Sequence, residues 1–140
     1  ADYVRAHPDQ QIKLAYFGSA VPTRYLPCTA LPSYMDFTPR ADLSPGTYVV
    51  SITQLLGVYD PEIRPTFWSA VARSAYATLG QLAASADDAA QRAEAEREYK
   101  DLRAKRLISR LRERPPDARV GYSLFIYHLD TDDIARLTEP

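Results

Sequence analysis

Proline is distributed very unevenly along this chain of 140 residues. Eight of the eleven prolines lie between Pro8 and Pro65, and none lies between Thr66 and Arg114. Proline lacks a backbone N–H and clashes with the preceding helical turn, so it excludes long helices from the first region. We therefore expect strands, turns and loops before position 66 and long helices after it.

Three apolar segments are predicted to be strands: Ile12–Phe17, Thr47–Thr53 and the stretch "ARVGYSLFIYHLD" at Ala118–Asp130. The last is apolar on both of its alternating faces, which is typical of a strand inside a sheet that is covered on both sides. Helical or long loop connections separate the three segments. We therefore expect an α/β fold, with a small, mostly parallel three-stranded sheet, flanking helices and right-handed crossovers.

The proline-free region has the spacing of two helices. From Thr66, the expected N-cap, apolar residues recur every three or four positions. A second helix, capped by Asp87 or Asp88, is expected to run to about Arg112, where the motif "RPPDA" ends it. We expect the two helices to form a projecting hairpin, inserted at about 66–114.

Length and composition favour one folded domain, 1–140, with 46% hydrophobic and 25% charged residues. The formal net charge of −1 gives no overall attraction to nucleic acid, so no nucleic-acid partner is expected. Cys28 is the only cysteine, which excludes an intrachain disulfide and a cysteine-rich metal site. The longest apolar runs are shorter than the roughly 20 residues of a membrane-spanning helix.

No cofactor or nucleophile motif is found. The G-x-G-x-x-G, P-loop and G-x-S-x-G patterns are absent, so we expect no nucleotide cofactor and no serine hydrolase. His128 with Asp130, Asp132 and Asp133 could ligate a metal ion. Acidic residues after a strand more often cap the following helix, and we expect capping here and no metal site.

A ligand site is predicted at one edge of the sheet, because open parallel sheets bind ligands beyond the carboxyl ends of their strands. The residues that this edge would carry are Ser19, Thr53, Gln54 and His128. Two tyrosines of the proline-rich loop, Tyr25 and Tyr34, could form a wall of such a pocket. The alternative is that these tyrosines only pack the loop against the domain.

Basic residues concentrate near the end of the second predicted helix. Acidic residues are few between Arg103 and Arg114, and Arg106, Arg110 and Arg112 could contact phospholipid headgroups or a lipid-linked phosphate. Glutamate and aspartate are interleaved with the basic residues along the rest of the helix. That pattern is typical of a solvated helix face, which is the alternative interpretation.

Three segments resemble the C-terminal soluble region of bacterial membrane glycosyltransferases of the GT-C type, which are polyprenyl-phosphate-sugar-dependent and mannosyltransferase-like. The segments are "IKLAYFGSAVPTRY", "SPGTYVVSITQLLGVY" and "RERPPDARVGYSLFIYHL". The resembling positions are Tyr16–Gly18, Ser51–Gly57 and Ala118–Tyr127, and the last is the most specific. The predicted hairpin is longer than the corresponding segment of that family, and the Asp-Trp-Gly stretch that often precedes the first strand is absent.

The resemblance implies a domain at the extracytoplasmic (periplasmic) face of the cytoplasmic membrane, joined to a membrane-embedded catalytic region of the same polypeptide. The parent protein would transfer a sugar from a lipid-phosphate carrier to an acceptor. The catalytic acidic residues of such enzymes lie in the membrane region, so no catalytic residue is assigned to this chain. An acceptor glycan, a protein or anionic lipid would be the domain's partner.

The leading hypothesis is therefore a non-catalytic accessory domain of a membrane glycosyltransferase, acting in acceptor recognition or partner docking. A second hypothesis is a free-standing protein-interaction domain that docks a partner through its helical hairpin. A third is a small enzyme with a pocket beside Thr53 and Gln54.

Overall fold

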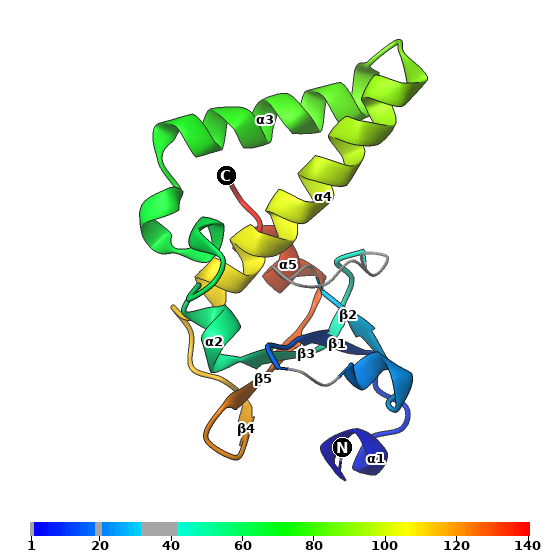
Figure 1. The fold of residues 1–140 in the computed structure, drawn as a ribbon, viewed down its shortest axis with the longest axis vertical. Helices are drawn as coiled ribbons and strands as arrows, with labels where there is room; N and C mark the ends of the chain where they lie inside the picture. The colour runs from blue at the N-terminus through cyan, green and yellow to red at the C-terminus, as the bar shows by residue number, and fades with distance from the viewer. Residues whose placement is uncertain (1, 19–20, 32–41) are drawn as a thin grey trace.

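The computed structural model describes residues 2–18, 21–31 and 42–140, and it shows a mixed α/β fold (Figure 1). Among these residues the sheet has five strands in the order β2-β1-β3-β5-β4. The strands are β1 (Ile12–Ala15), β2 (Cys28–Ala30), β3 (Gly46–Ser51), β4 (Ala118–Val120) and β5 (Leu124–Leu129).

The strand directions differ from the mostly parallel three-stranded sheet that was expected. β1 is parallel to β2 and β3, but β5 is antiparallel to both β3 and β4. Two long helices lead the chain away from the sheet after β3 and back again. Arg112, just after the second helix, donates a hydrogen bond to the carbonyl of Ile63, which precedes the first (3.1 Å). The chain re-enters the sheet in β4, which runs in the same direction as β3, and the turn between β4 and β5 then reverses it, so β5 is antiparallel to both.

The segment predicted as one strand, Ala118–Asp130, is a hairpin of β4 and β5. Gly121 has φ +61°, a left-handed conformation that glycine adopts at little steric cost, and the neighbouring Tyr122 is fully exposed at the turn. The interior position is confirmed for β5, which pairs with β3 on one side and β4 on the other. Ile126 and Tyr127 face opposite sides of the sheet and are both buried.

The predicted hairpin consists of α3 (Ala70–Ser85) and α4 (Ala89–Leu111). The two helices meet at their connection, far from the sheet, and separate toward it (Figure 1). The carboxyl-terminal part of α4 lies over the sheet, whereas α3 stands away from it. The hairpin therefore projects from the sheet, as expected.

Side chains cap the long helices. Asp88 caps α4 by accepting a hydrogen bond from the backbone N–H of Gln91 at 2.7 Å, so one of the two predicted caps is confirmed. The predicted cap Thr66 is wrong, because Ser69 caps α3 and Thr66 lies in the short helix η3 (Pro65–Phe67). The remaining helices are α1 (Asp2–Ala6), α2 (Ile52–Leu55), α5 (Thr131–Leu137), η1 (Pro22–Arg24) and η2 (Pro61–Ile63).

Helices cover both faces of the sheet. On one face Leu107 of α4 and Ile134 of α5 pack in a cluster with Tyr48 of β3. On the other face Val4 of α1 packs in a smaller cluster with Ile126 of β5. None of the helices in the described parts of the chain combines the length and the apolar composition needed to cross a bilayer.

Candidate functional site

The residues predicted for the sheet edge do not come together as expected. Thr53 and Gln54 lie in α2, directly after β3, where Gln54 is buried and Thr53 is half-buried. His128 lies at the opposite end of the sheet, beside Thr47 at the start of β3, because β5 is antiparallel. Its placement on the same edge as Thr53 was wrong.

The tyrosine wall of that predicted site is only partly described. Tyr25 follows η1 and is 81% exposed, so it stands in solvent and contributes little to the packing of its segment. Ser19 and Tyr34 lie outside the described residues. The predicted role of Asp130 is confirmed, since its side chain caps α5 by accepting a hydrogen bond from the N–H of Asp133 at 2.8 Å.

The three arginines predicted to contact phosphate each have partners within the chain. The guanidinium of Arg106 lies 4.5 Å from the ring centroid of Trp68, and its Nε donates to the carbonyl of Glu139 at 3.0 Å. Arg110 donates to the carbonyl of Arg136 at 3.1 Å, and Arg112 donates to Ile63. These arginines therefore hold the hairpin against its surroundings, and contact with phosphate stays a prediction.

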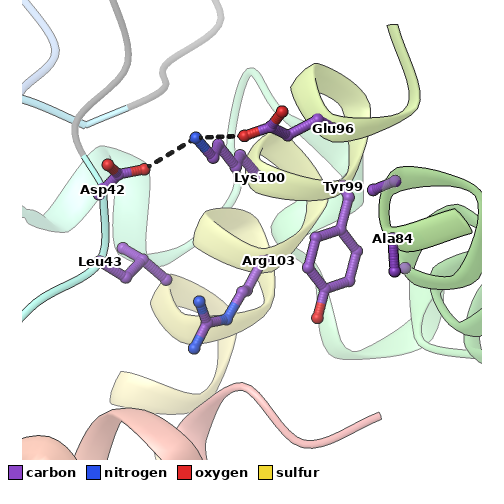
Figure 2. A pocket seen from close by; sticks show the side chains of 9 residues that line it. Asp42, Leu43, Ala84, Glu96, Tyr99, Lys100 and Arg103 are labelled. Carbon is purple, nitrogen blue, oxygen red and sulfur yellow. Dashed lines mark ion pairs between the residues drawn. The ribbon is translucent and has the colours of Figure 1, made fainter. Parts of the chain in front are cut away.

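A cavity of about 410 Å³ lies between the hairpin and the segment before β3 (Figure 2). Small residues of α3 form one wall, and polar side chains of α4 form another. The residues that line it are Asp42, Leu43, Gly80, Ala83, Ala84, Glu96, Tyr99, Lys100 and Arg103. Apolar walls with a few polar groups are typical of small-molecule sites.

The two cations of this cavity differ in their pairing. Lys100 lies between Glu96 and Asp42, at 2.9 and 3.1 Å (Figure 2). Hydrogen bonds from the ammonium to Glu96 and then to Asp42 raise the pKa of Lys100. This ion pair also ties α4 to the segment before β3. Because both sides are largely exposed, its contribution to stability is small.

Arg103 has no carboxylate within ion-pair distance among the described residues. Its guanidinium lies next to tyrosines instead, where it acts to lower the pKa of Tyr76 and Tyr48. Burial has the larger effect and raises both pKa values, that of Tyr48 to about 12, so both hydroxyls are neutral. A guanidinium without an acidic partner can bind a carboxylate or phosphate group through two parallel hydrogen bonds.

The position of the Tyr99 ring explains why α3 has a glycine, Gly80, where it faces α4. A Cβ added to Gly80 would lie 3.2 Å from Cε2 of Tyr99, closer than an ordinary van der Waals contact. Gly80 therefore allows the ring of Tyr99 to lie against α3, where Tyr99 also packs on Tyr76 with 5.0 Å between ring centroids. No pattern in the sequence identified this cavity, because the contact between Gly80 and Tyr99 joins two helices and depends on how they pack.

The side chains that line the cavity offer ion-pair and hydrogen-bond partners beside an aromatic ring. Within the parts of the chain that the structure describes, no group of three or more histidine, cysteine, aspartate or glutamate side chains could hold a metal ion. The chain matches no protein-family model, and no curated protein and no solved structure is significantly similar to it.

Proposed function

We propose that the chain is a non-catalytic accessory domain of a membrane glycosyltransferase that transfers a sugar from a lipid-phosphate carrier. We further propose that it recognises the acceptor at the cavity between the hairpin and the segment before β3. The observation that carries the proposal is Arg103, which has no acidic partner among the described residues and lines the cavity between the inserted hairpin and the segment before β3. The domain would lie at the extracytoplasmic face of the membrane.

The arrangement of the three resembling segments supports the first part of the proposal. They form β1, then β3 with α2, then β4 with β5, and these strands are neighbours in the sheet. Their polar and glycine residues have structural roles: Ser51 caps α2, and Gly57 and Gly121 adopt positive φ. The segments therefore build a scaffold, and the hairpin inserted between them supplies most of the cavity lining.

The test uses the full-length gene product in membranes, with a labelled polyprenyl-phosphate sugar and a range of acceptors. We expect Arg103→Gln to raise the KM for the acceptor while donor hydrolysis without acceptor is unchanged. The matched control is Arg73→Gln, because Arg73 is an exposed arginine of the same hairpin that does not line the cavity. Equal kinetics for the two variants would reject acceptor recognition at this cavity, and a full-length product without hydrophobic segments would reject the glycosyltransferase assignment.

A protein-interaction domain is the second candidate, and the exposure of α3 favours it. Only Ala72 and Tyr76 of its sixteen residues are buried, and Val71 is 78% exposed. A partner helix could pack along this face. The alternative predicts that a full-length protein without membrane segments binds a partner and that Val71→Asp abolishes the binding.

A further inference from the structure

The three lysines of the chain have very different surroundings. Lys105 lies near three carboxylates, those of Asp60, Glu62 and Asp101. Lys100 lies between two carboxylates, as described above. Lys13, in the middle of β1, has no carboxylate within 4.0 Å among the described residues and is only 4% exposed. A buried ammonium without an acidic partner is uncommon, because removal of a charge from water is costly.

The contacts of Lys13 stabilise its charged form only weakly. Its Nζ donates one hydrogen bond, to the carbonyl of Pro45 at 3.2 Å, and lies 5.2 Å from the ring centroid of Tyr48. An ammonium has three N–H donors, so two are left for other partners. Tyr48 supplies its ring and no negative charge, because burial raises the pKa of its hydroxyl to about 12. Burial lowers the pKa of Lys13, whereas the pKa values of Lys100 and Lys105 are raised.

Lys13 also lines a cavity of about 600 Å³ at the ends where β1 and β2 begin. The walls come largely from the segments before β1, β2 and β3, and they include Gln11, Pro27 and Ser44. Three other titratable residues line the cavity: Asp9, Cys28 and Asp42. Lys13 also lies next to Tyr48, whose hydroxyl is in turn influenced by the charge of Arg103. The lining includes the carboxylates of Asp9 and Asp42, the second of which is paired with Lys100, so an uncharged ligand meets less repulsion here than an anionic one.

We propose that Lys13 is a reactive amine site that binds small neutral aldehydes in this cavity as an imine. The Nζ lone pair attacks the carbonyl carbon, and the C=O double bond is replaced by C=N. The carbonyl oxygen leaves as water with the two protons that Nζ loses. Such a reaction needs the neutral amine, and burial, which lowers the pKa of Lys13, increases the neutral fraction of this amine relative to that of an exposed lysine. The proposal does not depend on the glycosyltransferase assignment.

The test is reductive labelling of the whole chain with propionaldehyde and cyanoborohydride near neutral pH. Peptide mapping by mass spectrometry separates the three lysines from the α-amino group, which reacts independently. We expect Lys13 to be labelled several-fold faster than Lys100 and Lys105 in the folded protein, with a rate that reaches its plateau at lower pH. In concentrated urea the three rates should become equal, because the unfolded chain gives the lysines the same surroundings.

Two variants complete the experiment. Lys13→Met should remove the fast label and leave the labelling of the other two lysines unchanged. Lys105→Met is the matched control and should leave the fast label in place. Labelling of Lys13 that is as slow as that of Lys100 in the folded protein would overturn the proposal, whether the cause is a protonated amine or a cavity that the aldehyde cannot enter.

Discussion

In β3 five of six residues are buried, whereas in α3 only two of sixteen are. The sheet is held by continuous apolar packing on both faces. Helix α3 depends on a small cluster at the base of the hairpin, where Trp68 and Tyr76 pack edge to face with 5.4 Å between ring centroids. The sheet is therefore stabilised by buried apolar area, whereas α3 is stabilised by a few directional contacts. Single substitutions should therefore act globally in the first region and locally in the second.

The largest effect is expected from Leu107→Ala. Leu107 is fully buried where α4 packs on the sheet, and its truncation leaves a cavity, so the free energy of unfolding should fall by about 3 kcal/mol. Urea denaturation followed by circular dichroism measures the change. Leu56→Ala is the control, because Leu56 is 51% exposed and should change stability by less than about 0.5 kcal/mol. Similar losses in both variants would contradict the assignment of the core.

Tyr76→Phe tests the hairpin. The Tyr76 hydroxyl donates to the carbonyl of Thr138 at 2.9 Å in a buried site, and the variant leaves that carbonyl without its donor. We expect a loss of about 2 kcal/mol, seen mainly as faster hydrogen exchange in α3, with slow exchange retained in β3. Equal acceleration in both elements would show that the hairpin and the sheet unfold as one unit.

The burial of Tyr48 in the sheet should make the free energy of unfolding depend on pH in the alkaline range. In the unfolded chain tyrosine ionises near its ordinary pKa of 10.0, whereas Tyr48 stays neutral until about pH 12 in the folded chain. The unfolded state therefore loses protons first, and stability falls as pH rises from 10 to 12, by about 1 kcal/mol at pH 11. Denaturation of Tyr48→Phe across this range should show a shallower fall than the parent. An unchanged slope would exclude Tyr48 as the source.

The smallest effect is expected from Arg106→Gln. The variant removes the contact with the Trp68 ring and the hydrogen bond to Glu139, which are partly exposed, and should cost about 0.5 kcal/mol.

Contact with lipid is tested separately, by binding of the domain to vesicles. If Arg106, Arg110 and Arg112 contact headgroups, binding should require anionic lipid and should weaken as the salt concentration rises. Binding that persists in the triple variant with glutamine at these positions would reject that role.

Local patterns predicted the elements whose signals lie within a few residues. Such signals predicted the apolar segments that contain β1 and β3 and the proline-free hairpin. They also predicted the helix caps at Asp88 and Asp130. The short strand β2 was missed because it has only three residues and lies among prolines. The turn at Gly121 was missed because the residues on both sides of it are apolar and continue the strand pattern.

The candidate site was predicted less well, for a different reason. The edge residues were grouped on the premise of parallel strands, and the antiparallel β5 placed His128 at the opposite end of the sheet. The arginines of α4 were identified by their charge, but their partners Ile63, Arg136 and Glu139 are distant in sequence. Charge and spacing do not indicate to which backbone carbonyl a guanidinium will donate a hydrogen bond.

The sequence by itself determined that the chain folds as an α/β domain with a helical hairpin, because proline placement and apolar periodicity act through the backbone of each segment. Only the tertiary structure decided the direction of β5, the internal pairing of the arginines and the burial of Lys13 away from every carboxylate in the described parts of the chain. Those properties depend on where the chain re-enters the sheet after the hairpin, on the turn that reverses it between β4 and β5, and on which distant segments then become neighbours. The physical reason is that strand direction and side-chain environment are set by the path of the whole chain, which no local pattern encodes.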